Sequence, residues 1–186
     1  TALVAMNGNR LLATSDGGRP WEIDPATLDP VSPVGRLDDY RAMADVPWRR
    51  FLCPMNIASA HPPYDAETGE YHGVSLSIVP VSGMVYLELL AWDGEGAMRR
   101  VPVLGPDLQP LLISQNAHQI CITRHHVVIL DASGTIEFGK LLNPPHSRAA
   151  GLTTPPRPES YFYVVDRDAI RSATGSVVAL ESDEAL

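Results

Sequence analysis

The six histidines are the residues of this sequence whose types and positions most suggest chemistry. His61 precedes two prolines, which restrict the backbone to extended and turn conformations, so its side chain should project from a strand end. His118 begins a predicted strand in which Ile120 and Ile122 share its face. Apolar surroundings favour the neutral imidazole, which is the form that binds metals. His61 and His118 are therefore candidate metal ligands.

A structural role for the same histidines stays open. A single strand histidine is more often a hydrogen-bonded core residue than a ligand, and the sequence has no HExxH motif, facial-triad spacing or Cys–His zinc pattern. His125 and His126 are adjacent at a strand start, so their side chains should point to opposite faces. His72 and His146 fall in expected loops.

The carboxylates near these histidines also admit two interpretations. Asp16 stands beside two glycines, where aspartate is typical of a turn, but it could instead accept the second N–H of a ligating imidazole. Asp65, Glu67 and Glu70 indicate a solvated turn. No catalytic group beyond the metal candidates and no substrate-binding residue is indicated. Gly-x-Ser-x-Gly and Gly-rich phosphate loops are absent, which leaves hydrolase and nucleotide-binding functions without support.

Short β-rich segments bounded by turn formers must position these residues. Asn7-Gly8 predicts a tight two-residue hairpin, and Asp131–Gly134 a second turn. Only 38–44 and 166–172 have helical character, and both are short. The fold class is therefore all-β, built from antiparallel hairpins as a sandwich, barrel or propeller. The predicted strands are Thr1–Met6, Arg10–Thr14, Gly73–Val79, Val85–Trp92, Arg99–Leu104, Gln119–Thr123, His126–Leu130, Thr135–Phe138 and Tyr161–Val165.

A weak internal repeat favours the propeller. The sequence DPATL at 24–28 returns as DAETG at 65–69, which is 41 residues later (65 − 24). A four-stranded propeller blade takes about 40 to 45 residues, so about four blades' worth of sequence is present. We expect one propeller-type unit over 1–186, with 171–186 as a tail or connector.

Composition excludes several classes of protein. The 186 residues carry 14 basic and 22 acidic side chains, a net charge of −8, and only 6% aromatic residues, which argues against a nucleic-acid partner. No apolar run approaches the roughly 18 to 20 residues of a membrane span. Two cysteines are too few for a disulfide scaffold. These features predict a soluble, cytoplasmic protein.

Four stretches together resemble the carotenoid cleavage oxygenase family, which includes apocarotenoid and stilbene-cleaving dioxygenases and the retinal pigment epithelium isomerase. They are RLLATSDGGRPWEIDPATLDPVSPVG, SAHPPYDAETGEYHGVSLS, NAHQICITRHHVVILD and PESYFYVVDRDAI. The AHPxxDxxTGE pattern is the most specific, and a V-x-x-R strand closes the series. The resemblance implies part of a seven-bladed β-propeller, with one non-haem Fe(II) per complete propeller held on the axis by four histidines.

Position by position, the resemblance makes His61 the first iron ligand and His118 the second. Asp16 falls where the family has a glutamate that hydrogen-bonds a ligand imidazole. The implied reaction uses O2 as co-substrate and cleaves a conjugated C=C bond of an apolar apocarotenoid- or stilbene-like molecule. The family draws such substrates from bilayers, but no basic or amphipathic stretch marks a membrane surface here, so peripheral membrane contact stays open.

The sequence departs from the family pattern in two ways. Gln119-Ile120 follows His118 where the family has Asp-Phe, and no histidine for a third or fourth ligand follows the YFYVVDRDAI strand. The chain therefore resembles a central fragment that is inactive alone and needs the rest of the propeller or a second chain. The alternatives are a catalytically inactive binding or structural module and an isomerase at the same iron site.

Overall fold

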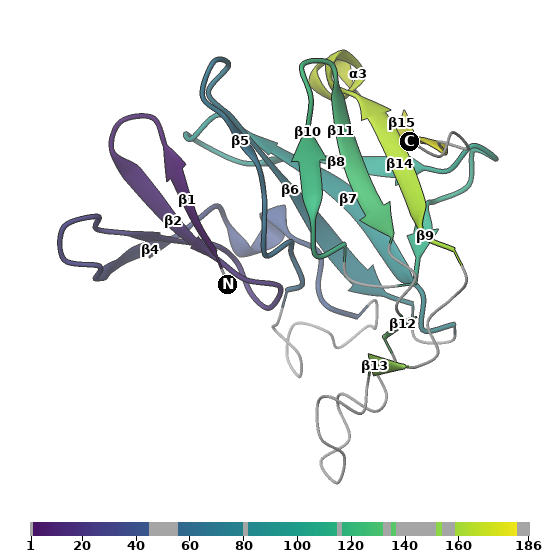
Figure 1. Ribbon diagram of the computed structural model, residues 1–186, viewed down its shortest axis with the longest axis horizontal. Coiled ribbons are helices and arrows are strands. Elements are labelled where there is room, and N and C mark those ends of the chain that lie inside the picture. Colours follow the sequence, from purple (N-terminus) through teal and green to yellow (C-terminus); the bar gives the residue numbers. More distant parts are fainter. Residues whose placement is uncertain are drawn as a thin grey trace, which may run out of the picture.

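The computed structural model describes residues 2–44, 56–79, 82–114, 117–131, 135–136, 152–153 and 159–181. Within these ranges the protein consists of mainly antiparallel strands, with one α-helix, α3 (Arg167–Ser172), and one 3-10 helix, η1 (Leu37–Asp39). The all-β prediction is confirmed. Figure 1 shows β1, β2 and β4 at the left, and β10, β11 and β14 in front of the strands of a middle sheet. No helix in the described ranges is long and apolar enough to cross a membrane.

The first sheet is an antiparallel meander. Its strands follow chain order, and its first hairpin replaces the predicted two-residue turn with a three-residue loop, because Met6 pairs with Arg10. The positive φ angles fall on Gly8 (75°) and Asn9 (59°), not on Asn7. The strands are β1 (Ala2–Met6), β2 (Arg10–Thr14), β3 (Trp21–Ile23) and β4 (Pro30–Pro33).

The middle sheet is the most deeply buried part of the protein. Residues 71–78 of β6 are all buried, and β6 pairs with β7 over its last eight residues. β15 joins this sheet through a parallel pairing with β8, and β9 pairs with the start of β7. The strands are β5 (Tyr64–Asp65), β6 (Glu70–Ile78), β7 (Val85–Trp92), β8 (Arg99–Leu104), β9 (Leu112–Ile113) and β15 (Val177–Val178).

A third sheet has the strand order β10-β11-β14-β16. Helix α3 follows β14 directly, and the side chain of Asp166 caps it by accepting a hydrogen bond from the amide of Ala169 (2.7 Å). A separate pair, β12 (Thr135–Ile136) and β13 (Leu152–Thr153), is antiparallel. The strands of the third sheet are β10 (Ile120–Ile122), β11 (His126–Asp131), β14 (Tyr161–Asp166) and β16 (Leu180–Glu181).

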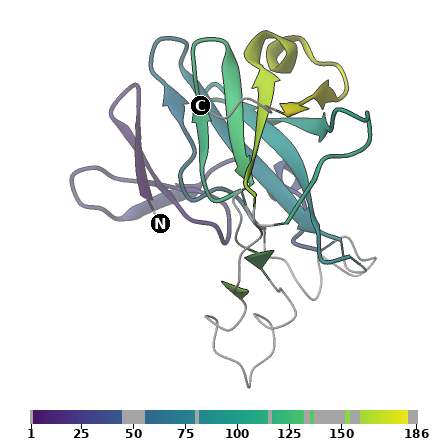
Figure 2. The ribbon, with the colours of Figure 1, turned by 45° about the vertical axis from the view of Figure 1, so that its right-hand side comes forward.

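Two hydrophobic clusters hold the three sheets together, one on each face of the middle sheet. The period-two alternation of β7 sends Leu87 and Leu89 into a cluster shared with the third sheet and α3. Leu90 and Trp92 point the other way, into a cluster with Met6 of the first sheet. Figure 2 shows the three sheets following one another across the molecule. This packing places strand ends from different sheets next to each other.

The described residues form three sheets of four or more strands and one separate two-stranded pair. One sequence-based expectation needs correction. Residues 171–181 are not a tail, because they complete α3 and form β15 and β16, which pair with β8 and β14. His146, residues 137–138 of a predicted strand and positions 132–134 of a predicted turn lie outside the described residues.

The DPATL and DAETG repeat is a recurring turn. Asp24 Oδ1 accepts from the amides of Ala26 and Thr27, and Asp65 Oδ1 accepts in the same way from Glu67 and Thr68. The fifth position has positive φ in both turns, at Leu28 and Gly69 respectively. One turn joins β3 to β4 and the other joins β5 to β6. The repeat therefore reflects shared turn chemistry and not equivalent positions in two blades.

Candidate metal centre

The fold brings His61 and His118 together from two different sheets. His61 lies just before β5 of the middle sheet, and His118 lies just before β10 of the third sheet. A parallel backbone bridge joins His61 to Gln119, and the hydroxyl of Ser59 donates to the carbonyl of His118 (2.9 Å). The two imidazole centroids are 4.8 Å apart, and the ring planes meet at 72°. The two rings are therefore in edge-to-face contact.

Asp16 connects both histidine segments to the end of β2. Its carboxylate oxygens lie 2.8 and 3.0 Å from Nδ1 of His118. Oδ1 also accepts a hydrogen bond from the amide of Ala60, the residue before His61 (3.2 Å). An ionised carboxylate accepts only, so Nδ1 of His118 carries the proton and Nε2 is the nitrogen that can ligate a metal. Asp16 therefore contacts one candidate ligand, and its role beside a bound metal stays a prediction.

The surroundings of the histidines differ from two expectations. The side chain of His118 is 45% exposed, so it does not share the apolar environment of Ile120. The reason is that β10 begins only at Ile120, which leaves His118 in the preceding loop. His72 lies within β6, not in a loop, and is 1% exposed. Burial lowers the pKa of His72, and its Nε2 has no hydrogen-bond partner among the described residues.

The geometry of the pair fits two ligands of a single metal ion. Two imidazoles bound at right angles, with metal–nitrogen distances of about 2.1 Å, would place their centroids roughly 4.6 Å apart. The observed separation is 4.8 Å. No group of three or more His, Cys, Asp or Glu side chains that could hold a metal occurs in the described part of the chain. His61 and His118 therefore fit as part of a ligand set, and their role as ligands stays a prediction.

An ionic cluster on the segment that follows His61 was missed from the sequence. Asp65 and Glu70 are partly buried, and Arg167 of α3 donates to both carboxylates while Arg171 also binds Glu70. The hydrogen bonds from Arg171 lower the pKa of Glu70 to about 2, and Arg167 lowers that of Asp65. Glu67 is exposed, as expected. The available signals were the arginine of V-x-x-R and the acidic residues of the AHPxxDxxTGE pattern.

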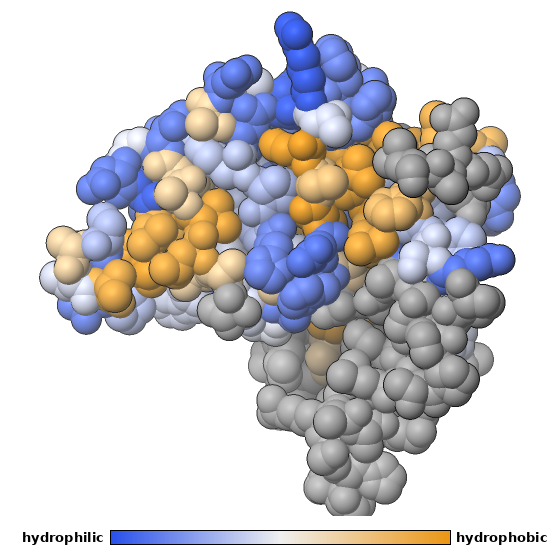
Figure 3. All heavy atoms as spheres, in the orientation of Figure 1, coloured by the Kyte–Doolittle hydropathy of each residue, from blue (hydrophilic) through white to orange (hydrophobic). Residues whose placement is uncertain are grey.

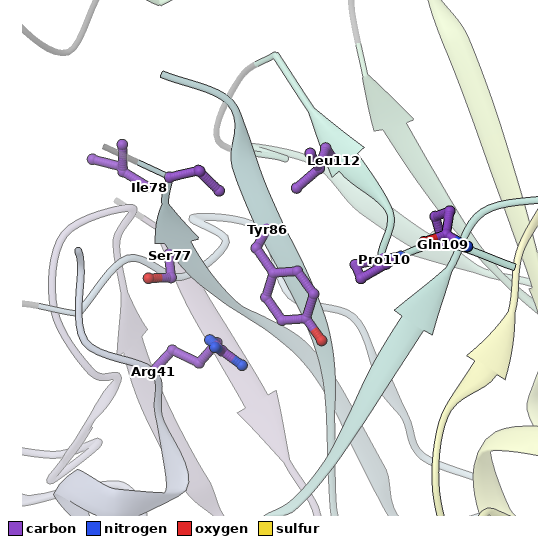
Figure 4. Close-up of a pocket in the computed structure, with 8 residues that line it drawn as sticks. Arg41, Ser77, Ile78, Tyr86, Gln109, Pro110 and Leu112 are labelled. Carbon is purple, nitrogen blue, oxygen red and sulfur yellow. The ribbon is translucent and has the colours of Figure 1, made fainter. Parts of the chain in front are cut away.

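A pocket of about 420 Å³ lies away from the two histidines. In Figure 4 the guanidinium of Arg41 lies beside the ring of Tyr86, and the separation between its Cζ and the ring centroid is 4.3 Å. Neither candidate ligand contributes to the pocket wall, so the pocket is separate from the candidate metal centre. It is lined by Arg41, Ser77, Ile78, Val79, Tyr86, Gln109, Pro110 and Leu112.

An apolar area covers part of the first sheet. Figure 3 shows hydrophobic side chains gathered at the left of the molecule, over this sheet. Leu3 of β1 and Val31 of β4 are 60% and 61% exposed, although strand residues of this type are usually buried. The first sheet therefore presents apolar side chains to the outside of the described structure.

Comparison with solved structures shows a shared fold. An apocarotenoid oxygenase of Synechocystis, in a mutant form, superposes with a TM-score of 0.57 at 21% identity over 97% of this chain and 33% of its own. The cobalt-substituted form of that oxygenase gives 0.57 at 20% identity, over 99% and 34%. A lignostilbene dioxygenase of Pseudomonas brassicacearum gives 0.54 at 20% identity, over 90% and 30%. The chain thus has the fold of part of a β-propeller and spans about a third of these structures.

No curated protein sequence matches the chain significantly. Residues 1–183, nearly the whole chain, match the family described as retinal pigment epithelial membrane protein. This match covers all the motifs that carried the resemblance, including both candidate ligands and Arg167. The chain therefore belongs to the retinal pigment epithelial membrane protein family, whose solved relatives include apocarotenoid and lignostilbene oxygenases.

Proposed function

We propose that this chain is part of a non-haem Fe(II) dioxygenase that cleaves a conjugated C=C bond of an apocarotenoid- or stilbene-like substrate with O2. The observation that carries the proposal is the imidazole pair of His61 and His118, with centroids 4.8 Å apart. Family membership and the apocarotenoid and lignostilbene oxygenases with the same fold support it.

In this proposal His61 and His118 supply two of four imidazole ligands, and the rest of the propeller or a second chain supplies the others. The chain spans about a third of its solved relatives, which leaves most of their length for the other two ligands. The exposed apolar area of the first sheet, which includes Leu3 and Val31, supports such a partner, because a neighbouring blade would bury it.

The residues of this chain orient the candidate ligands and leave the chemistry to the metal. Iron held by neutral imidazoles would bind and activate O2 next to the substrate double bond. Asp16 fixes the tautomer and ring orientation of His118 through Nδ1, so Nε2 is the nitrogen that would hold the metal. The bridge between His61 and Gln119 fixes the spacing of the two backbones.

A second candidate function is a catalytically inactive binding module of the same fold. Gln119-Ile120 stands where the family has Asp-Phe, and Gln119 is exposed beside the candidate site. This change in the residues after His118 favours a scaffold without the activity. Product formation separates the two functions.

The test is anaerobic metal analysis of the whole protein, followed by assays with apocarotenoid and stilbene substrates. We expect one iron per protein, carbonyl cleavage products, and loss of both in His61→Ala and His118→Ala. His126→Ala is the matched control, because His126 is an exposed histidine of β11 outside the pair. Absence of iron in the unaltered protein would refute the proposal; bound iron without any product would favour the inactive module, and isomerised product an isomerase.

A further inference from the structure

We propose that Arg167 is a positioning residue for His61 and His118, because its guanidinium ties together the two chain segments that carry them. The inference rests on the proposed metal site and concerns how this chain keeps the site in shape. Arg167 is 3% exposed and is the first residue of α3, directly after β14 of the third sheet.

The two segments, residues 61–65 and 119–123, are connected to each other at both ends. At one end the backbone of His61 bridges to that of Gln119 in parallel. Each chain then runs on for four residues (65 − 61 and 123 − 119), to Asp65 and Thr123 respectively. At this second end Nη2 of Arg167 donates to Oδ2 of Asp65, and Nη1 donates to the carbonyl of Thr123 (3.0 Å). The guanidinium of Arg167 therefore connects the two segments at the end away from the histidines.

The chemistry of arginine suits this position. Its planar guanidinium directs donors along fixed, divergent lines, so it can bond a carboxylate of one sheet and a carbonyl of another at once. The backbone amide of Arg167 also donates to the carbonyl of His125 (2.8 Å), which anchors the residue in the third sheet. A lysine has a single ammonium group and cannot hold both partners in the same geometry.

The other contacts of Arg167 strengthen the link to the middle sheet. Nη2 also lies 3.3 Å from the hydroxyl of Thr68 and 3.2 Å from Oε2 of Glu70. Asp65 accepts the amides of Glu67 and Thr68 through its other oxygen, so the turn after His61 is already fixed when Arg167 binds it. Displacing the arginine would thus remove three contacts between this turn and α3, and would leave the ion pair between Arg171 and Glu70.

Arg171 provides a matched control on the same helix. It has the same charge and binds the same carboxylate, Glu70, at 2.7 Å. Its side chain is 35% exposed, and its side-chain partners in the described structure are Glu70 and Asp168. Removing Arg171 therefore removes an ion pair to the turn without cutting the connection to Thr123.

The experiment uses the whole protein, metal-free, with 15N-labelled histidine rings. NMR follows the Nδ1 proton of His118 that bonds Asp16 and the ring-to-ring contact with His61. A parallel Co(II) titration follows affinity and the visible absorption spectrum. We expect Arg167→Ala to lose the ring contact, to change the Co(II) spectrum and to weaken Co(II) binding about 10- to 100-fold. Arg167→Lys should give an intermediate loss, and Arg171→Ala should stay within about twofold.

Each remaining outcome decides a separate question. If Arg167→Ala keeps the ring contact and binds Co(II) within about twofold of the unaltered protein, the positioning role is wrong. If the unaltered protein shows the ring contact but binds no Co(II), the proposed function fails. The positioning role of Arg167 is then decided by whether Arg167→Ala keeps the contact between the two histidine rings. If Arg167→Ala does not fold, Asp65→Asn takes its place, because it keeps the turn acceptor and removes the charge that faces Arg167. Unchanged ring contact and Co(II) affinity in Asp65→Asn would then refute the proposal.

Discussion

The carboxylate of Asp16 lies 2.8 Å from Nδ1 of His118 and accepts the amide of Ala60 at 3.2 Å. One side chain from the end of β2 thus fixes the ring of one candidate ligand and the backbone beside the other. The residues come from positions 16, 60 and 118, so only the packing of all three sheets creates the arrangement.

Removing the Asp16 carboxylate should weaken metal binding without removing a ligand. We expect Asp16→Ala to lower the Co(II) affinity of the whole protein about 10- to 100-fold, the usual effect of losing a hydrogen-bond partner of a ligating histidine. Asp16→Asn keeps an acceptor but loses the charge, so its affinity should fall less. Isothermal titration measures both, and equal affinity in Asp16→Ala and the unaltered protein would contradict the role given to Asp16.

Gly73 should tolerate no side chain. An alanine Cβ at this position of β6 would lie 2.9 Å from Cε1 of Tyr71, whose ring is 1% exposed and cannot move aside easily. Gly73→Ala should therefore lower the free energy of unfolding by about 1–3 kcal/mol. Gly175→Ala is the control, since its Cβ would meet nothing within 4 Å and its φ is not positive. Equal denaturation midpoints of the two variants would show that the Tyr71 ring moves aside, which would contradict the prediction.

The recurring turn predicts opposite effects at its fifth position. Gly69 has φ of 73°, and a built Cβ would lie in ordinary contact with the Tyr64 hydroxyl (4.0 Å), so Gly69→Ala should cost about 1 kcal/mol from backbone strain. Leu28 holds the same position at φ 63° and is 62% exposed, so Leu28→Gly relieves strain and loses little packing. Chemical denaturation should rank Leu28→Gly at or above the unaltered protein in stability; a large loss in Leu28→Gly would contradict this account.

Buried His72 should make stability depend on pH. Burial is the main cause that lowers the pKa of His72, and the charges of Arg167 and Arg171 lower it further. The nearby carboxylates of Glu70 and Asp65 act in the opposite direction, but the pKa remains lowered. Below the unfolded value of about 6.5 the unfolded chain takes up a proton that the native state refuses, so stability falls as pH drops. His72→Gln should lose less stability between pH 7 and 5.5, as measured by thermal unfolding at each pH. Parallel curves for the two proteins would contradict the prediction.

Below pH 4.5 a second group should act in the same direction. The pKa of Glu70 is lowered to about 2, so its stabilising contribution is present above about 4.5 and is lost as pH falls toward 2. The two windows lie in different pH ranges, so thermal unfolding measured at each pH separates the two contributions.

Local signals in the sequence predicted much of the fold. Arg10–Thr14, Val85–Trp92 and Arg99–Leu104 are strands with the predicted bounds, because short apolar-rich segments between turn formers specify them locally. Trp21–Ile23 and Leu180–Glu181 were not predicted, because such short strands exist only through pairing with neighbours.

The candidate site was predictable in part. Family motifs identified His61, His118 and Asp16, but the turn chemistry of Asp65 concealed its second contact with Arg167, which lies 102 residues away. Burial of such a cluster depends on how the middle and third sheets meet. Periodicity within one strand carries no information about that contact.

Anomalous diffraction from crystals of the whole protein loaded with Co(II) tests the central claim most directly. The account predicts one cobalt peak about 2.1 Å from Nε2 of His118 and bonded also to the ring of His61. A peak bound by other residues, or none near these two rings at full loading, would contradict it.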